Sequence, residues 1–139
     1  MTPLADVRAD VHGSLIAQMG AAGLPATSVH AFVPDELATP AVWIVSPFGI
    51  RPSDPRTIVA EVSVIVVVDG AEPAQLAALD DLTAAAWVAL ELVGTATLAT
   101  PTAFVAGGPT LHAVTVSADV DVDVRTLCPP TLEAVGLAY

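Results

Sequence analysis

The chain has 139 residues and is strongly acidic, with fifteen Asp and Glu against four Arg and no Lys, for a formal net charge of −11 at pH 7. This balance excludes a protein that wraps nucleic acid, because such binding needs a cationic surface that displaces counterions from the phosphates. Hydrophobic residues make up 54% of the chain and charged residues 14%, against ordinary values of about 45–50% and about 25%. A small monomer would expose much of this apolar surface, so we expect partner subunits to cover it.

The length fits a single domain, which we place at residues 1–124, followed by a carboxyl-terminal arm or tail at 125–139. Cys128 is the only cysteine, so no disulfide can form within the chain. Residues 92–118 carry no charge, but two prolines and three glycines indicate strands and turns there rather than a transmembrane helix. We therefore expect no membrane partner.

The first half of the chain predicts one helix and three strands. Apolar residues recur at helical spacing over residues 4–19. Short strands are expected at 28–33 and 41–46, and the segment 47–55, with its three prolines, is expected to be irregular. The clearest strand is 56–68, where the even positions after the first are all apolar. Such alternation is typical of a strand with one face on a core, and its far end, apolar at every position, is expected to be covered on both faces.

A long helix is expected over residues 73–93, and both of its sides are apolar. Its predicted core stripe is Leu76, Leu79, Leu82, Ala86, Leu90 and Val93. The opposite side has one acid among six residues, which are Ala77, Asp81, Ala84, Ala85, Val88 and Leu92. A helix that is apolar nearly all round is usually buried on two sides. We therefore expect this second side, with Trp87 at its boundary, to contact another subunit.

The last predicted strands, 95–105 and 110–124, form a hairpin. In the second of them Asp119, Asp121 and Asp123 share the odd-numbered face, and apolar residues dominate the even-numbered face. The element order is then α-β-β-β-α-β-β. With short connections, it predicts an α+β fold in which two helices pack on one face of a mixed, mostly antiparallel sheet.

The three aspartates are the most conspicuous candidate for a site. Alternate strand residues lie roughly 6.6–6.8 Å apart, whereas Ca²⁺ takes six to eight oxygens at about 2.3–2.6 Å, so the aspartates suit a metal poorly. They form either a solvated face, or an acidic surface that lines a channel or pairs with a neighbour's Arg. The histidines match no zinc spacing, and no catalytic or nucleotide-binding motif is present. We expect no enzyme activity, no metal and no cofactor.

Two arginines flank the proline-rich segment. Arg51 and Arg56 have Asp54 between them. They are either ordinary loop charges or groups that dock onto an acidic neighbour, because a ring of strongly negative copies needs counter-charges. We group these three residues with the outer side of the long helix as expected subunit contacts.

The passages of the chain, taken in order, resemble one known family. They are the amino-terminal helix, the passage V-H-A-F-V-P-D-E-L-A-T-P-A-V-W-I-V-S-P from Val29 to Pro47, the long valine strand, the P-A-Q-L-A-A-L-D-D-L passage from Pro73 to Leu82, and the closing hairpin. Over most of its length the chain resembles the tail terminator, or tail-completion, proteins of bacteriophages with long non-contractile tails.

This resemblance implies a virion protein, assembled in the host cytoplasm, whose copies form a hexameric ring that caps the tail tube. Its partners would be other copies of itself, the tail tube protein and a head-completion or neck protein, and no catalytic residue is implied. The sheet would face the channel and the helices would face outward. Asp119, Asp121 and Asp123 would then line the channel, where DNA slides because like charge suppresses adsorption.

Two alternatives stay open. The chain could be a tail-tube or head-closure subunit of the same particle, which copy number would distinguish from a terminator. It could instead be a small bacterial α+β enzyme or ligand-binding domain with an apolar pocket. The absence of any acid–base or nucleophile constellation in the sequence counts against this second alternative.

Overall fold

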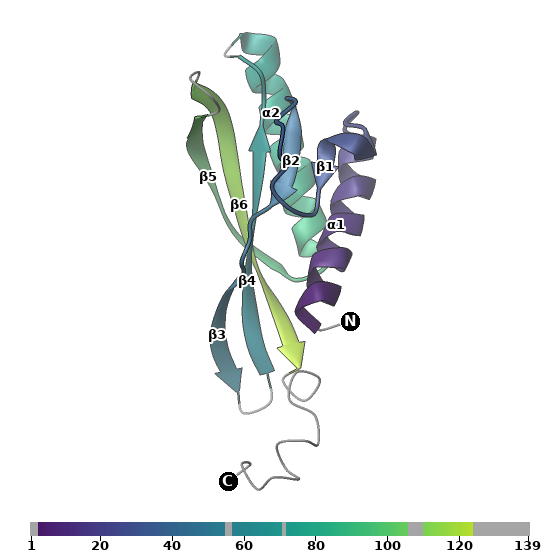
Figure 1. Ribbon diagram of the computed structural model, residues 1–139, viewed down its shortest axis with the longest axis vertical. Helices are drawn as coiled ribbons and strands as arrows, with labels where there is room; N and C mark the ends of the chain where they lie inside the picture. The colour runs from purple at the N-terminus through teal and green to yellow at the C-terminus, as the bar shows by residue number, and fades with distance from the viewer. Residues whose placement is uncertain (1–2, 55–56, 71, 106–109, 124–139) are drawn as a thin grey trace, which may run out of the picture.

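The computed structural model describes residues 3–54, 57–70, 72–105 and 110–123 (Figure 1). Within these ranges two long helices lie on one face of a six-stranded mixed sheet, so the predicted α+β class is confirmed. In chain order the elements are α1 (Pro3–Ala21), a short 3-10 helix (Ala26–Ser28), β1 (Val29–His30), β2 (Ala41–Ile44), β3 (Gly49–Asp54), β4 (Thr57–Val67), α2 (Pro73–Glu91), β5 (Thr95–Val105) and β6 (Thr110–Asp123).

The segment 47–55 differs from its prediction. It was expected to be irregular, but its residues Gly49–Asp54 form β3, which pairs with β4. Pro52 is compatible with this pairing because β3 is an edge strand, where a residue without an N–H group is tolerated. A register shift between Pro52 and Asp54 is the only irregularity within the pairing of these two strands.

The strands follow the order β1-β2-β4-β6-β5, and β3 also pairs with β4. β2 pairs with the second half of β4 and β3 with its first half, so β2 and β3 lie end to end along one side of β4. The link between them contains a cis peptide bond between Ser46 and Pro47. β1 runs parallel to β2, and the other pairs are antiparallel. In Figure 1 the ends of β3, β4 and β6 extend beyond the helices.

The main core lies between the helices and the sheet. The even-numbered residues of β4 and β6 point toward the helices, as the alternation predicts, and the two helices also pack against each other. Fully burying one such aliphatic side chain contributes about 1.5–3 kcal/mol relative to leaving it exposed. The largest buried side chains of this core include Val11, Leu15, Met19, Ile44, Val62, Val64, Val66, Leu90 and Val116.

Both helices end at glycines that the backbone requires. After α1, Gly23 has a φ of 94°, a conformation that suits glycine, and the next N–H, of Leu24, donates to the Met19 carbonyl oxygen at 2.8 Å. After α2, a Cβ on Gly94 would collide with the backbone carbonyl oxygen of Asp119 in β6. Gly94 therefore allows the chain to pass close to β6 as it enters β5.

The predicted core stripe of α2 is largely confirmed. Leu79, Leu82, Ala86 and Leu90 are buried, and Val93 is half-buried and packs against the core. The other member, Leu76, is 38% exposed. It lines a groove between the first turns of α2 and the β5–β6 hairpin, where the helix does not lie directly on the sheet.

A smaller apolar cluster covers the far end of β4 on the face opposite the helices. It consists of Ala41, Trp43, Val67 and Ala113, with Leu37 packed against them. Trp43 is only 2% exposed, although it points away from the main core. The expectation that this end of the strand is covered on both faces is therefore confirmed.

Leu90→Ala and Leu92→Ala compare the two sides of α2 with the same chemical change. Leu90 is fully buried and Leu92 is 65% exposed. We expect Leu90→Ala to lower the free energy of unfolding by about 2–5 kcal/mol, because a buried cavity replaces the lost side chain. Leu92→Ala should change it by no more than about 0.5 kcal/mol. Urea unfolding of both variants measures this, and equal losses would contradict the assignment of the buried side.

Candidate functional site

The sheet face opposite the helices carries a charged group formed across three strands. Arg51 of β3 donates two hydrogen bonds to the Asp119 carboxylate of β6, with N–O distances of 2.8 and 3.3 Å. Glu61 of β4 lies between them in the pairing, and its carboxylate is 3.5 Å from the same guanidinium. Arg51 is therefore paired with two carboxylates of its own chain, and its predicted contact with another subunit stays a prediction.

This pairing affects the titration of both partners. The hydrogen bond from Arg51 lowers the pKa of Asp119 below its ordinary value. The hydrogen bond and the charge of Asp119 raise the pKa of Arg51. The Asp119 carboxylate therefore stays ionised to a lower pH than an ordinary aspartate, and its ion pair with Arg51 continues to link β6 to β3 there.

The other two aspartates of the predicted acidic face, Asp121 and Asp123, are exposed at the end of β6. They belong to the part of the sheet that extends beyond the helices. Arg56 and the tail at 125–139 lie outside the described residues, and Asp54 is described only as the last backbone position of β3. The predicted roles of these residues stay predictions.

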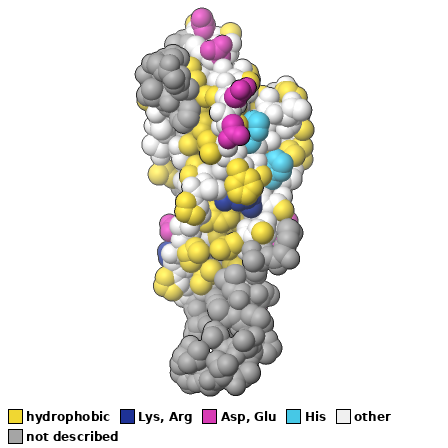
Figure 2. All heavy atoms as spheres, viewed as in Figure 1, with side chains coloured by type: hydrophobic (Ala, Val, Ile, Leu, Met, Phe, Trp, Pro, Cys, Tyr) yellow, Lys and Arg dark blue, Asp and Glu magenta, His cyan; other side chains and the backbone are white. Residues whose placement is uncertain are grey.

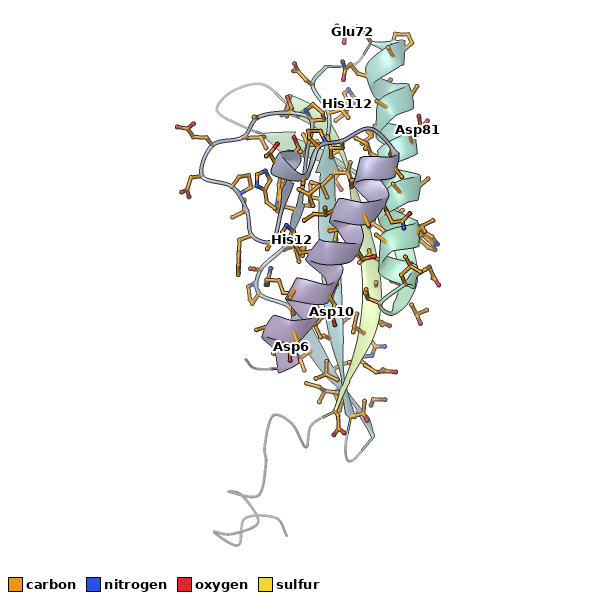
Figure 3. All side chains as sticks on the ribbon, turned by 90° about the vertical axis from the view of Figure 1, so that its right-hand side faces the viewer. Asp6, Asp10, His12, Glu72, Asp81 and His112 are labelled. Atoms are coloured by element: carbon orange, nitrogen blue, oxygen red, sulfur yellow. The ribbon has the colours of Figure 1, made fainter. Side chains whose placement is uncertain are left out.

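The second candidate surface is the outer face of α2, by which we mean Ala77, Asp81, Ala84, Val88 and Leu92. All five side chains are exposed, including 46% of Val88 and 65% of Leu92. Asp81, labelled in Figure 3, lies in the third turn of α2 and lines a small pocket with Ala22, Gly23 and Leu24, the residues that follow α1. Among the described residues, no ion pair or hydrogen bond involves the Asp81 carboxylate.

Two other residues predicted near this face are less accessible. Ala85 and Trp87 are half-buried, and both pack against the main core. Trp87 lies at the edge of the outer face, so the boundary position expected for it is confirmed. Its contact with another subunit stays a prediction.

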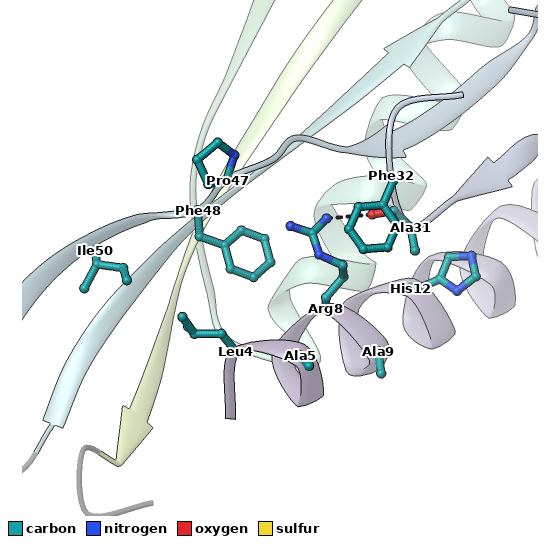
Figure 4. Close-up of a pocket in the computed structure, with 10 residues that line it drawn as sticks. All are labelled: Leu4, Ala5, Arg8, Ala9, His12, Ala31, Phe32, Pro47, Phe48 and Ile50. Atoms are coloured by element: carbon teal, nitrogen blue, oxygen red, sulfur yellow. Dashed lines mark hydrogen bonds between the residues drawn. The ribbon is translucent and has the colours of Figure 1, made fainter. Parts of the chain in front are cut away.

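A third surface, which the sequence analysis missed, is an apolar pocket beside α1 (Figure 4). Its volume is about 540 Å³. The first turns of α1, the segment after β1 and the link from β2 to β3 form its walls. Figure 2 shows hydrophobic side chains gathered around a basic group on this face. The lining residues are Leu4, Ala5, Arg8, Ala9, His12, Ala31, Phe32, Pro47, Phe48 and Ile50.

Arg8 is the polar centre of this pocket, which we call the Arg8 pocket. Its guanidinium carbon lies 4.4 Å from the ring centroids of both Phe32 and Phe48, a distance typical of cation–π contacts. One nitrogen donates to the Ala31 carbonyl oxygen at 2.6 Å. His12 lies one turn further along α1, and its Nε2–H donates to the Val29 carbonyl oxygen at 3.1 Å. Partial burial lowers the pKa of Arg8.

The sequence contained part of the signal for this pocket. Leu4, Arg8 and His12 are four residues apart and share one side of the first helix. The two aromatic rings come from loops that no periodicity connects to that helix. Only the packing of α1 against β1 and the link from β2 to β3 brings Phe32 and Phe48 to Arg8.

No three His, Cys, Asp or Glu side chains of the described ranges come together as metal ligands would. None of the helices described is both long and apolar enough to cross a bilayer. Compared with known proteins, the chain matches no family model and no curated protein at a significant level.

Arg51→Gln tests the charged group on the open sheet face. We expect the pKa of Asp119 to rise toward its ordinary value, because its hydrogen-bond donor and counter-charge are removed. Because the pKa of Asp119 is lower in the folded chain than in the unfolded chain, the ionised carboxylate stabilises the fold at pH values above its unfolded pKa of about 3.9. This stabilisation is lost as the pH falls through the pKa of Asp119 in the folded chain. The variant should therefore be less stable than the wild type at pH 7 and equally stable in strong acid.

Titration of the Asp119 side chain by NMR, with urea unfolding at pH 7 and at acidic pH, measures both effects. Arg8→Gln is the control, because Arg8 lies on the helix side of the sheet and contributes nothing to the pKa of Asp119. An unchanged pKa of Asp119 in Arg51→Gln would contradict the contact.

Proposed function

We propose that the chain is a virion structural subunit whose copies form a hexameric ring at the end of a phage tail tube, as the tail terminator proteins it resembles do. The observation that carries this proposal is the outer face of α2, a long helix side that is exposed, nearly uncharged and opposite the core. An apolar helix face of this kind favours burial against another protein chain. The tail tube protein and a head-completion or neck protein would contact the ring from either side.

The two sides of the molecule support different roles in such a ring. Helices cover one face of the sheet, and the opposite face carries Glu61, Asp119, Asp121 and Asp123 at its extended end. In the proposed ring this acidic face lines the channel. DNA phosphates would be repelled by it, so the genome passes without adsorbing. Asp121 and Asp123 are exposed at the end of this face, so they would contribute to the repulsion.

The proposal concerns structure rather than catalysis. The described titratable groups with shifted pKa values are Arg8, Arg51 and Asp119. Arg51 and Asp119 form a surface ion pair, and Arg8 lies on the other face of the sheet. Within the described ranges, the side-chain hydrogen bonds of these three groups join Arg51 to Asp119 and Arg8 to the Ala31 carbonyl oxygen, and none reaches a Ser, Thr or Cys side chain. This arrangement favours an assembly protein over the alternative of an enzyme.

Copy number in purified particles tests the proposed role. We expect the chain to be present in virions at one ring per tail, about six copies, because a symmetric ring closes after a fixed number of subunits. Quantitative mass spectrometry against the capsid protein gives this number. Many copies per particle would identify a tube subunit instead. A chain that is absent from particles and monomeric at all concentrations would contradict the proposal.

Asp121→Lys with Asp123→Lys tests the channel. We expect the double variant to fold and to enter particles, because both side chains are exposed. Infectious titre should fall about tenfold or more, since lysines in the channel would bind the phosphates of the passing DNA. Asp35→Lys with Glu36→Lys is the matched control, because the same charge change is then made in an exposed loop. Equal titres for the two double variants would contradict a channel position.

A further inference from the structure

We infer that the ring contact joins two unlike surfaces, so that the outer face of α2 of one copy docks into the Arg8 pocket of the next, with Asp81 paired to Arg8. This inference rests on the proposed function, because it assumes that copies of the chain assemble with one another. It goes further by naming both surfaces and the ion pair at their centre.

Arg8 is the first reason for this assignment. The two arginines of the described ranges are Arg8 and Arg51, and Arg51 is already held by Asp119 and Glu61. A guanidinium has five N–H donors, whereas the contacts of Arg8 with described residues are one bond to the Ala31 carbonyl oxygen and two aromatic rings. None of the carboxylates described lies within ion-pair distance of it. An arginine in an apolar pocket without an anion favours an acidic group from outside.

The outer face of α2 has the complementary pattern. Asp81 is its one acid, it has no ion pair with a described residue, and Ala84, Val88 and Leu92 follow it on the same side of the helix. The Arg8 pocket has one cation among apolar walls and exposed rim residues, including Phe32 at 60% and Ile50 at 51%. Each surface thus offers apolar area around a single charge of opposite sign. An arginine in a pocket surrounded by apolar contacts is typical of the centre of an interface.

The positions of the two surfaces favour a ring rather than a closed pair. α1 and α2 pack side by side, and the two surfaces do not overlap: the Arg8 pocket lies along the first half of α1, whereas Asp81 lies on α2 beside the residues that follow α1. One copy can therefore engage two neighbours at once, one through each surface. Contacts between unlike surfaces repeat head to tail, and they close into a ring when the rotation per subunit permits.

Assembly through the proposed contact should depend on the opposite charges of Arg8 and Asp81. Docking would remove water from Arg8 and Asp81 together, so reversing one charge would leave two like charges buried against each other. We expect Arg8→Asp or Asp81→Arg alone to raise the concentration needed for assembly by about tenfold or more. Sedimentation velocity of the full-length chain over a concentration series measures this concentration.

Mixing the two variants is the decisive step. In an equimolar mixture, an alternating ring would place Arg8 against Asp81 at one contact and the reversed pair at the next. The mixture should therefore assemble at concentrations where neither variant does. The double variant Arg8→Asp with Asp81→Arg should also assemble, because every contact then has the reversed pair.

Asp80→Arg is the matched control. It makes the same charge change one residue earlier on α2, where the side chain lines the groove beside the β5–β6 hairpin instead of the outer face. This variant should assemble like the wild type. If Arg8→Asp does not fold by circular dichroism, Arg8→Gln replaces it. Adding Asp81→Arg to Arg8→Gln should then raise the concentration needed for assembly much less than adding it to the wild type.

The possible outcomes separate the interface from the proposed function. Assembly of the wild type with no loss in Asp81→Arg overturns the interface and leaves the ring proposal standing. Octanoate, a small apolar carboxylate, tests the alternative that the Arg8 pocket binds a ligand. The interface is overturned in favour of such a ligand if octanoate stabilises the wild type against unfolding but not Arg8→Gln, and if Asp81→Arg assembles like the wild type. A wild type that stays monomeric at all concentrations overturns the interface, whereas the proposed function falls only if the chain is also absent from particles.

Discussion

The antiparallel pairing of β4 with β6 is the constraint on which the other features depend. Eleven residue pairs run in unbroken register, from Thr57 with Asp123 to Val67 with Ala113. Side chains alternate between the two faces, so burying the even-numbered residues of both strands under the helices places every odd-numbered residue on the opposite face. A slip of one residue in either strand would turn its acids, Glu61 in β4 or the aspartates of β6, into the core. The hydrophobic core therefore determines where the acidic face lies.

The same arrangement gives the molecule surfaces of different character. Because both helices cover one face, α2 keeps an exposed side, and the first turns of α1 leave the Arg8 pocket beside the link from β2 to β3. The two arginines of the described ranges lie on different surfaces. Arg51 ties three strands together on the open face, and Arg8 lies between two aromatic rings on the helix side. One cation is paired with carboxylates of its own chain, and the other has only a backbone carbonyl oxygen and two aromatic rings as described contacts.

Sequence patterns predict least where residues far apart in the chain meet. The segment 47–55 was predicted to be irregular because of its prolines, yet most of it forms the edge strand β3. That strand places Arg51 beside Asp119, a contact between residues 68 positions apart that no local pattern could indicate. The Arg8 pocket was missed for the same reason. Its helical stripe was visible, but its aromatic walls come from two loops.

The sequence by itself determined the α+β class, the position of both helices, the hairpin, the face of β6 that carries the aspartates and the exposed apolar side of α2. These features follow from periods of 2 and 3.6 residues, which are local properties of a strand and a helix. Only the tertiary structure decided that β2 and β3 share one side of β4, that Arg51 is neutralised within its chain and that Arg8 lies in a pocket. Side-chain alternation states which way a residue points, whereas its neighbours depend on which strands pair and how the helices pack across them.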